Sequence, residues 1–213
     1  IYFKRERSSI KQLYKKLISK SFYPIMFHDI MLSPNLILQS FKNAKIIYID
    51  RHPVDMVIEW QQKGYYGKIF SHKRNATLSF KYENNLYPYW CYGNEKKLSK
   101  INNKFEKIIL MLETIYIQQK KNYLKFKKKY PKNIFYVNYD HMVEKTDLIL
   151  KNLSKFLNTK KDNKTDLIIN RENGNRKINI KDRLKNRNYI QKQISYKYIK
   201  IFNYLEKIYE KKN

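Results

Sequence analysis

Arg51 stands where a short apolar run gives way to the start of a helix. Residues 46–49 are β-branched or aromatic, which indicates a strand covered on both faces. Pro53 suits a first helical position, and Asp55 follows in the first turn, where its charge favours the helix dipole. We therefore expect Arg51 at the carboxyl end of a parallel strand, where open α/β sheets bind anions and a guanidinium can bind phosphate bidentately. An ordinary surface ion pair of Arg51 with Asp55 or Asp50 is the alternative.

Strand and helix patterns alternate around this junction. Gly64 predicts the end of the helix that Pro53 begins. Ser99 is the expected cap of a long helix that Pro131 stops. Residues 64–97 predict a loop or small insertion, and residues 158–194 predict mostly loop with weak helix. The expected strands span residues 24–28, 45–51 and 133–138, and the expected helices span residues 8–20, 35–41, 53–63, 99–129, 142–157 and 196 onward. This order predicts an α/β fold with a mostly parallel sheet wrapped by helices.

Composition bounds the function classes. The 213 residues suffice for one good core with at most a small subdomain. The single cysteine, Cys91, excludes a disulfide within the chain and argues against a cysteine-rich metal site. No stretch approaches the roughly 20 apolar residues of a membrane span, and no signal-peptide pattern follows Ile1, so we expect a cytoplasmic protein that binds no metal. The oligomeric state is left open.

The net charge of +28 has two readings. It fits a polyanionic partner such as nucleic acid, an anionic membrane or an acidic glycan. It equally fits an AT-biased genome, because the chain is rich in Lys, Asn, Ile and Tyr and its lysines are spread along the whole length. An anionic ligand therefore needs support from particular residues.

Three segments resemble the sulfotransferases that use 3′-phosphoadenosine 5′-phosphosulfate. Residues 41–55 (FKNAKIIYIDRHPVD) look like the 3′-phosphate-binding strand, loop and helix of that family. Residues 134–147 (IFYVNYDHMVEKTD), followed by LSKFL at 153–157, are similar to the family's core strand and helix. Residues 27–29 (FHD) match the strand that carries the family's catalytic histidine. The resemblance covers roughly residues 24–160. It implies a single domain with a P-loop-nucleotide-transferase-like, three-layer α/β/α fold and a helix-rich C-terminal half.

The resemblance also implies roles for particular residues. His28 would be the base that takes the proton of an acceptor hydroxyl or amine, on a glycan or a small molecule. Arg51 would anchor the 3′-phosphate of the donor nucleotide. Arg176 and Lys177 resemble the basic segment that reaches the same phosphate from the C-terminal side, although a solvated charge run is the other reading of that pair. No specific nucleic acid is expected as a partner.

Two departures from the family concern donor binding. Glu59 stands where the family has a serine, eight residues after the motif arginine, and its carboxylate cannot donate a hydrogen bond to phosphate. The Gly- and Ser/Thr-rich loop that cradles the 5′-phosphosulfate has no counterpart in the chain. We expect that loop, with its βα unit, upstream of Ile1 in the full-length protein.

Two other functions suit the same residues. One is a basic module that binds nucleic acid or another polyanion, favoured by the charge and by aromatic residues interleaved with lysines. The other is a catalytically inactive relative that keeps the fold as a scaffold, favoured by Glu59 and the absent loop. A related transferase with a different nucleotide donor is a further alternative.

Overall fold

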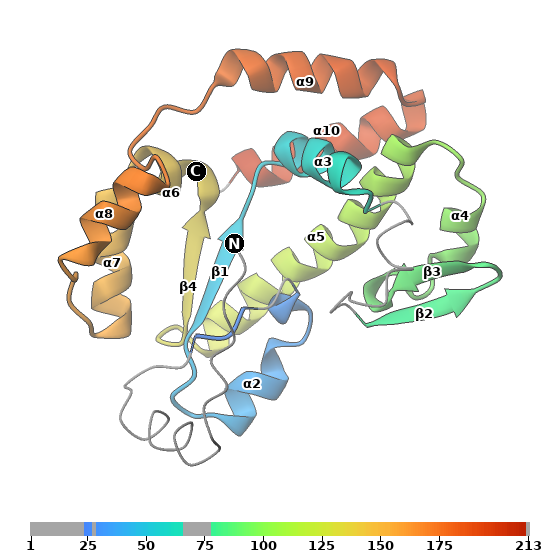
Figure 1. The fold of residues 1–213 in the computed structure, drawn as a ribbon. Coiled ribbons are helices and arrows are strands. Elements are labelled where there is room, and N and C mark those ends of the chain that lie inside the picture. The colour runs from blue at the N-terminus through green and yellow to red at the C-terminus, as the bar shows by residue number, and fades with distance from the viewer. Residues whose placement is uncertain (1–23, 27–28, 66–77, 212–213) are drawn as a thin grey trace, which may run out of the picture. The chain divides into compact units, whose positions relative to one another are not determined.

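A computed structural model describes residues 24–26, 29–65 and 78–211. Residues 31–213 form one compact unit, which holds the sheets and all the α-helices named below (Figure 1). The described elements are η1 (Ile30–Leu32), α2 (Pro34–Ser40), β1 (Ile46–Asp50), α3 (Pro53–Lys63), β2 (Ser79–Tyr82), β3 (Asn85–Pro88), η3 (Tyr89–Cys91), α4 (Glu95–Ser99), α5 (Lys104–Lys129), β4 (Ile134–Asn138), α6 (Tyr139–Glu144), α7 (Thr146–Leu157), α8 (Lys164–Arg171), α9 (Ile180–Lys192) and α10 (Tyr196–Glu210).

The two strands predicted around the motifs, β1 and β4, pair in parallel (Figure 1). Their register runs from Ile46 opposite Ile134 to Asp50 opposite Asn138, so both strands end at the same edge. Each strand leads into a helix there, α3 after β1 and α6 after β4. The α/β class and the parallel pairing are therefore confirmed, with a sheet of two strands in the described part of the chain. The larger three-layer, P-loop-like arrangement stays a prediction.

Helices cover the two faces of this sheet unequally. Ile46, Tyr48 and Asp50 are buried, and the ring of Tyr48 lies 5.5 Å from that of Tyr123 on α5. On the opposite face, Ile47 and Ile49 are 37% and 52% exposed. The prediction of a strand covered on both faces is therefore wrong for β1.

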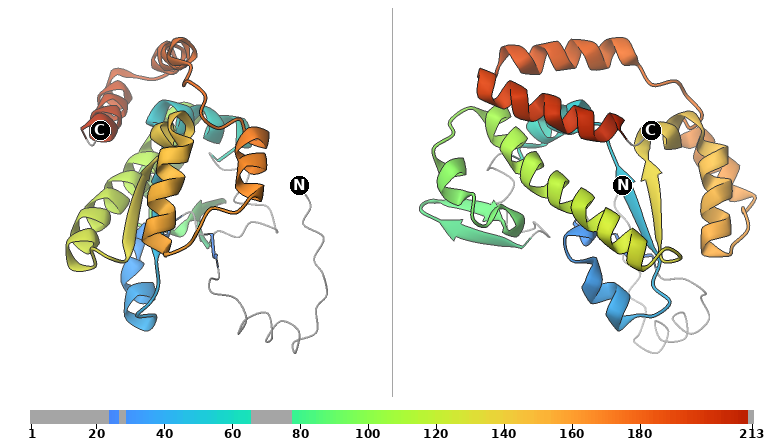
Figure 2. Two further views of the ribbon diagram at one scale, coloured as in Figure 1. Left: turned by 90° about the vertical axis from the view of Figure 1, so that its left-hand side faces the viewer. Right: turned by 180° about the vertical axis from the view of Figure 1, so that it is seen from behind.

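On the second face, helix α7 packs against β4 and leaves β1 partly exposed. The ring of Phe156 on α7 lies 5.2 Å from that of Phe135 on β4. Figure 2 (left) shows α5 and α7 on opposite sides of the strands. An apolar run of β-branched residues thus satisfies strand geometry without specifying how many of its faces a helix will cover.

The main hydrophobic core forms where α5 packs against α3 and α10 (Figure 2, right). Ile108, Ile109 and Leu112 of α5 are buried against apolar residues of those two helices. The predicted cap of α5 is wrong. Ser99 ends the short helix α4, and Asn103 is the N-cap, its side chain accepting hydrogen bonds from the N–H groups of Phe105 and Glu106. The helix ends at Lys129, before Pro131 as predicted.

Residues 64–97 contain more regular structure than a loop in their described part. Gly64 ends α3 with a left-handed φ of 75°, as its position predicts. Strands β2 and β3 form an antiparallel hairpin, and η3 follows. Tyr87 and Cys91 from this segment are buried in the main core.

The prediction that residues 158–194 are mostly loop is wrong, because they contain α8 and α9. Helix α9 has one buried residue, Ile190, so it lacks the apolar stripe from which helices are predicted. Ionic contacts hold it instead. Arg187 donates from Nε to both carboxylate oxygens of Glu206 on α10, at 3.1 and 2.9 Å.

A buried ion pair joins the end of β1 to α5. Asp50 and Lys120 are 2% and 5% exposed, and their charged groups are in direct contact. The hydroxyl of Tyr136 on β4 donates a second hydrogen bond to Asp50, at 2.9 Å, and the Lys120 ammonium lies 5.1 Å from the centre of that ring. Removing one partner of a buried pair leaves an uncompensated charge in the interior.

Replacing Lys120→Met should therefore lower the free energy of unfolding by about 3–5 kcal/mol. The double variant Asp50→Asn, Lys120→Met removes both charges, and the amide oxygen of the new side chain can still accept the hydrogen bond from Tyr136. It should therefore recover most of the unfolding free energy that Lys120→Met loses. Urea unfolding followed by circular dichroism measures both. A double variant no more stable than Lys120→Met would contradict the assignment.

Candidate functional site

The candidate site lies at the carboxyl edge of the parallel sheet, as expected for an anion site in an α/β fold. Arg51 follows the last residue of β1 and precedes the N-terminus of α3. Its side chain is 36% exposed, and its guanidinium carbon lies 5.0 Å from the ring centre of Tyr139, the residue after β4. The two parallel strands thus bring together Arg51 and Tyr139, which are 88 positions apart in the sequence.

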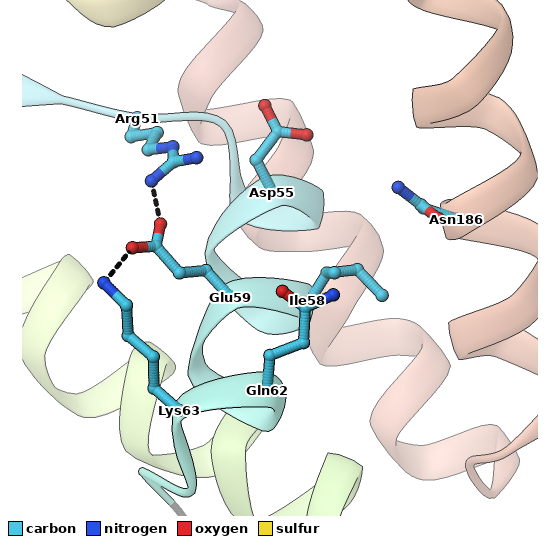
Figure 3. A pocket seen from close by; sticks show the side chains of 7 residues that line it. All are labelled: Arg51, Asp55, Ile58, Glu59, Gln62, Lys63 and Asn186. Carbon is cyan, nitrogen blue, oxygen red and sulfur yellow. Dashed lines mark hydrogen bonds and ion pairs between the residues drawn. The ribbon is translucent and has the colours of Figure 1, made fainter.

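Glu59 binds Arg51 directly. One carboxylate oxygen of Glu59 contacts Nη1 of Arg51, and the other contacts Nζ of Lys63 (Figure 3). Partial burial acts to raise the pKa of Glu59, but the hydrogen bond from Lys63 and the charges of both cations outweigh it and lower the pKa. The alternative of an ion pair is therefore correct in kind but wrong in its partner, because Arg51 pairs with Glu59 and not with Asp55 or Asp50.

A pocket of about 470 Å³ opens beside this ion pair. Figure 3 shows Arg51, Glu59 and Lys63 along one side of α3, with Asn186 projecting from the facing α9. Its described lining is Arg51, Asp55, Ile58, Glu59, Gln62, Lys63 and Asn186. We call this the Arg51 pocket. The Nε of Arg51 is buried and has no hydrogen-bond partner among the described residues. Because this Nε is shielded from solvent, the exposed part of the Arg51 side chain, which lines the pocket, is the part that suits an anion.

A second arginine, Arg183 on α9, binds Asp55, which lines the pocket. It donates to Asp55 in the first turn of α3, at 2.6 and 3.3 Å, and to Asp140 in the first turn of α6, at 2.7 and 3.0 Å. The Arg183 side chain is only 11% exposed. No local sequence pattern assigns Arg183 a role. The signal that could have pointed to it is a first-turn aspartate after each of two parallel strands, because their aligned ends place the two carboxylates together.

His52 is the other residue that sequence reasoning missed. It is the N-cap of α3, where its Nδ1 accepts a hydrogen bond from the N–H of Val54 at 3.2 Å. Its ring meets that of Tyr209 edge-on at 5.0 Å. Burial, assisted by the charge of Arg183, lowers the pKa of His52 to about 4. His52 is therefore neutral at physiological pH and serves the structure at this position.

Arg176 and Lys177 are not among the described residues that line the Arg51 pocket. His28 lies outside the described residues. Arg176 is in the loop between α8 and α9, where its Nη1 donates to the carbonyls of Glu172 and Asn173 at 3.1 and 2.7 Å, at the end of α8. Lys177 is the exposed residue that follows. The role of Arg176 and Lys177 at a nucleotide phosphate stays a prediction.

The described residues contain neither a metal-binding cluster nor a membrane-spanning helix. Among residues 24–26, 29–65 and 78–211, no group of three or more His, Cys, Asp or Glu side chains is arranged to hold a metal ion. None of the described helices is both long enough and apolar enough to cross a membrane. Comparisons with protein-family models, with curated proteins and with solved structures find no match for this chain.

The buried His52 makes stability depend on pH. Its folded pKa of about 4 lies below the usual value of about 6.5, so the unfolded chain takes up the proton first as pH falls. The contribution of neutral His52 to the free energy of unfolding is complete above pH ~6.5. It falls by about 2–3 kcal/mol as the pH is lowered towards ~4. The variant His52→Asn keeps an N-cap acceptor but cannot titrate. Urea unfolding at pH 7.5 and at pH 4.5 measures how much unfolding free energy each protein loses on acidification. The wild type should lose about 2–3 kcal/mol more than His52→Asn. Equal losses would refute the role of His52.

Proposed function

We propose that this protein is a sulfotransferase that transfers a sulfuryl group from 3′-phosphoadenosine 5′-phosphosulfate to a hydroxyl or amine acceptor. One observation carries the proposal. Arg51 and Glu59 occupy the two positions that the family resemblance assigns to the 3′-phosphate, and both line one pocket at the carboxyl end of a parallel strand. The pairing of β1 with β4, the strands of the two longest matching segments, supports the same reading.

Arg51 supplies the attraction for the 3′-phosphate in this proposal. The phosphate would accept from the guanidinium nitrogen that Glu59 now contacts, once Glu59 is displaced. Glu59 need not become unpaired, because its other oxygen already binds Lys63. An incoming phosphate can therefore displace Glu59 from Arg51 while Lys63 keeps the carboxylate charge compensated.

The transfer itself is an in-line displacement at sulfur. The acceptor oxygen or nitrogen forms a bond to sulfur as the bond between sulfur and the 5′-phosphate oxygen breaks, and adenosine 3′,5′-bisphosphate leaves. His28 takes the acceptor proton in this scheme. A Gly- and Ser/Thr-containing loop must hold the 5′-phosphosulfate in this scheme. Among the described residues β1 pairs with β4 alone, so the other edge of β1 would accept the strand that carries this loop.

An inactive scaffold with the same fold is the second candidate, and the contact between Glu59 and Arg51 favours it. A carboxylate on the phosphate-binding guanidinium competes with any anionic ligand for the same donors. The two candidates differ in whether the pocket binds the donor nucleotide, which a binding measurement decides.

Isothermal titration of the full-length protein with adenosine 3′,5′-bisphosphate should show saturable binding. Arg51→Ala should weaken it at least tenfold, because a charge-assisted hydrogen bond contributes about 1.5–3 kcal/mol. The matched control Arg171→Ala removes an arginine that lies outside the pocket and pairs with Glu172, so it should leave the affinity unchanged. Absence of binding by the wild-type protein would reject the transferase in favour of the scaffold.

Replacing Glu59→Ser should tighten binding of the same nucleotide by about tenfold, because the change removes a competing carboxylate and adds a hydroxyl donor at the phosphate. Glu172→Ser is the control, since it removes a carboxylate that pairs with an arginine elsewhere on the surface. Titration calorimetry measures both variants. Equal gains would mean that net charge alone, and not displacement of Glu59 from Arg51, sets the affinity.

A further inference from the structure

A second pocket lies on the other side of the sheet from α5, along α7 and the turn that follows it. Its volume is about 590 Å³, and it shares no lining residue with the Arg51 pocket. Its lining includes the carboxylate of Asp147, the apolar side chain of Leu150, and four lysines, Lys151, Lys155, Lys160 and Lys161. We call it the lysine pocket. Four lysines against one lining carboxylate give this pocket a net positive charge, which attracts anions.

The carboxylates near the lysine pocket are already neutralised. Lys161 pairs with Asp147 at 3.2 Å and with Asp166 at 2.5 Å. The second oxygen of Asp147 accepts a hydrogen bond from the Asn175 side chain at 2.7 Å. Within the described part of the chain, no carboxylate pairs with Lys151, Lys155 or Lys160, and we call these three the unpaired lysines.

The unpaired lysines are not needed to cap α7. Backbone groups satisfy two of the last four carbonyls of this helix, because the N–H of Asn158 donates to the carbonyl of Lys155 at 3.2 Å and that of Thr159 to the carbonyl of Ser154 at 2.9 Å, and no described lysine side chain bonds to the others. Asn158 has the left-handed φ of 57° that this type of helix end requires. Lys151 and Lys155 are four residues apart on one helix, a spacing at which like charges destabilise. Neither capping nor helix stability explains why these charges gather here.

We propose that the lysine pocket binds a small ligand that carries two or three phosphate or sulfate groups on a compact framework. The unpaired lysines neutralise the anionic groups, and the side chain of Leu150 contacts the framework. Multiple charges are required, because each exposed ion pair contributes little alone. The site is separate from the Arg51 pocket, so its occupancy does not depend on the proposed sulfuryl transfer.

The test uses two probes, tripolyphosphate and a heparin-derived sulfated disaccharide, titrated calorimetrically into the full-length protein at fixed ionic strength. A triple variant changes the unpaired lysines to glutamine. A matched control carries Lys121→Gln, Lys125→Gln and Lys128→Gln, three exposed positions on α5, so both variants lose the same net charge. The variant Arg51→Ala separates this site from the nucleotide pocket.

The pocket variant should bind at least one probe about tenfold more weakly than wild type, while the control and Arg51→Ala stay within about twofold. The probe that binds more tightly identifies phosphate or sulfate as the preferred group. Equal loss in both triple variants would show that diffuse surface charge binds the probe, and absence of wild-type binding would also overturn the proposal.

A second measurement avoids substitution. Saturating probe should protect the unpaired lysines of the wild-type protein from acetylation, read by mass spectrometry, and leave the three control lysines reactive. Uniform protection, or none, would refute the site.

Discussion

The buried contact between Asp50 and Lys120 is the constraint on which the candidate site depends. Both charges are almost fully removed from water, so β1 and α5 must keep the one arrangement that pairs them. Side chains alternate along an extended strand. With Asp50 directed into the protein against α5, Arg51 is directed away from it, towards the Arg51 pocket. The structural ion pair therefore decides where the guanidinium available for ligands is placed.

Two arginines at this edge of the sheet illustrate how burial separates structure from function. Arg183 is largely buried and pairs with both Asp55 and Asp140, so it holds α3, α6 and α9 together. Breaking these buried ion pairs to bind a ligand would cost a large free energy. Arg51 is partly exposed and pairs with a carboxylate that Lys63 also binds. An exposed ion pair contributes at most about 1 kcal/mol, so a ligand anion can compete for Arg51.

Sequence reasoning succeeded where local chemistry dominates. The apolar run that leads to Pro53 predicted β1 and α3, Gly64 predicted the end of α3, and the α/β class followed from the alternation of elements. It failed for α9, because ion pairs and not an apolar stripe attach that helix. It also failed at Ser99, since a turn after α4 gives the cap of α5 to Asn103.

By itself, the sequence determined that Arg51 follows a strand and precedes a helix, because proline, glycine and β-branched residues impose their backbone preferences locally. Only the tertiary structure decided which side chains meet it. Glu59 approaches Arg51 from the second turn of α3, Tyr139 comes from the neighbouring strand, and Arg183 closes the wall from α9. Such contacts depend on strand register and on pairing of buried charges across long separations, which no local pattern of residues records.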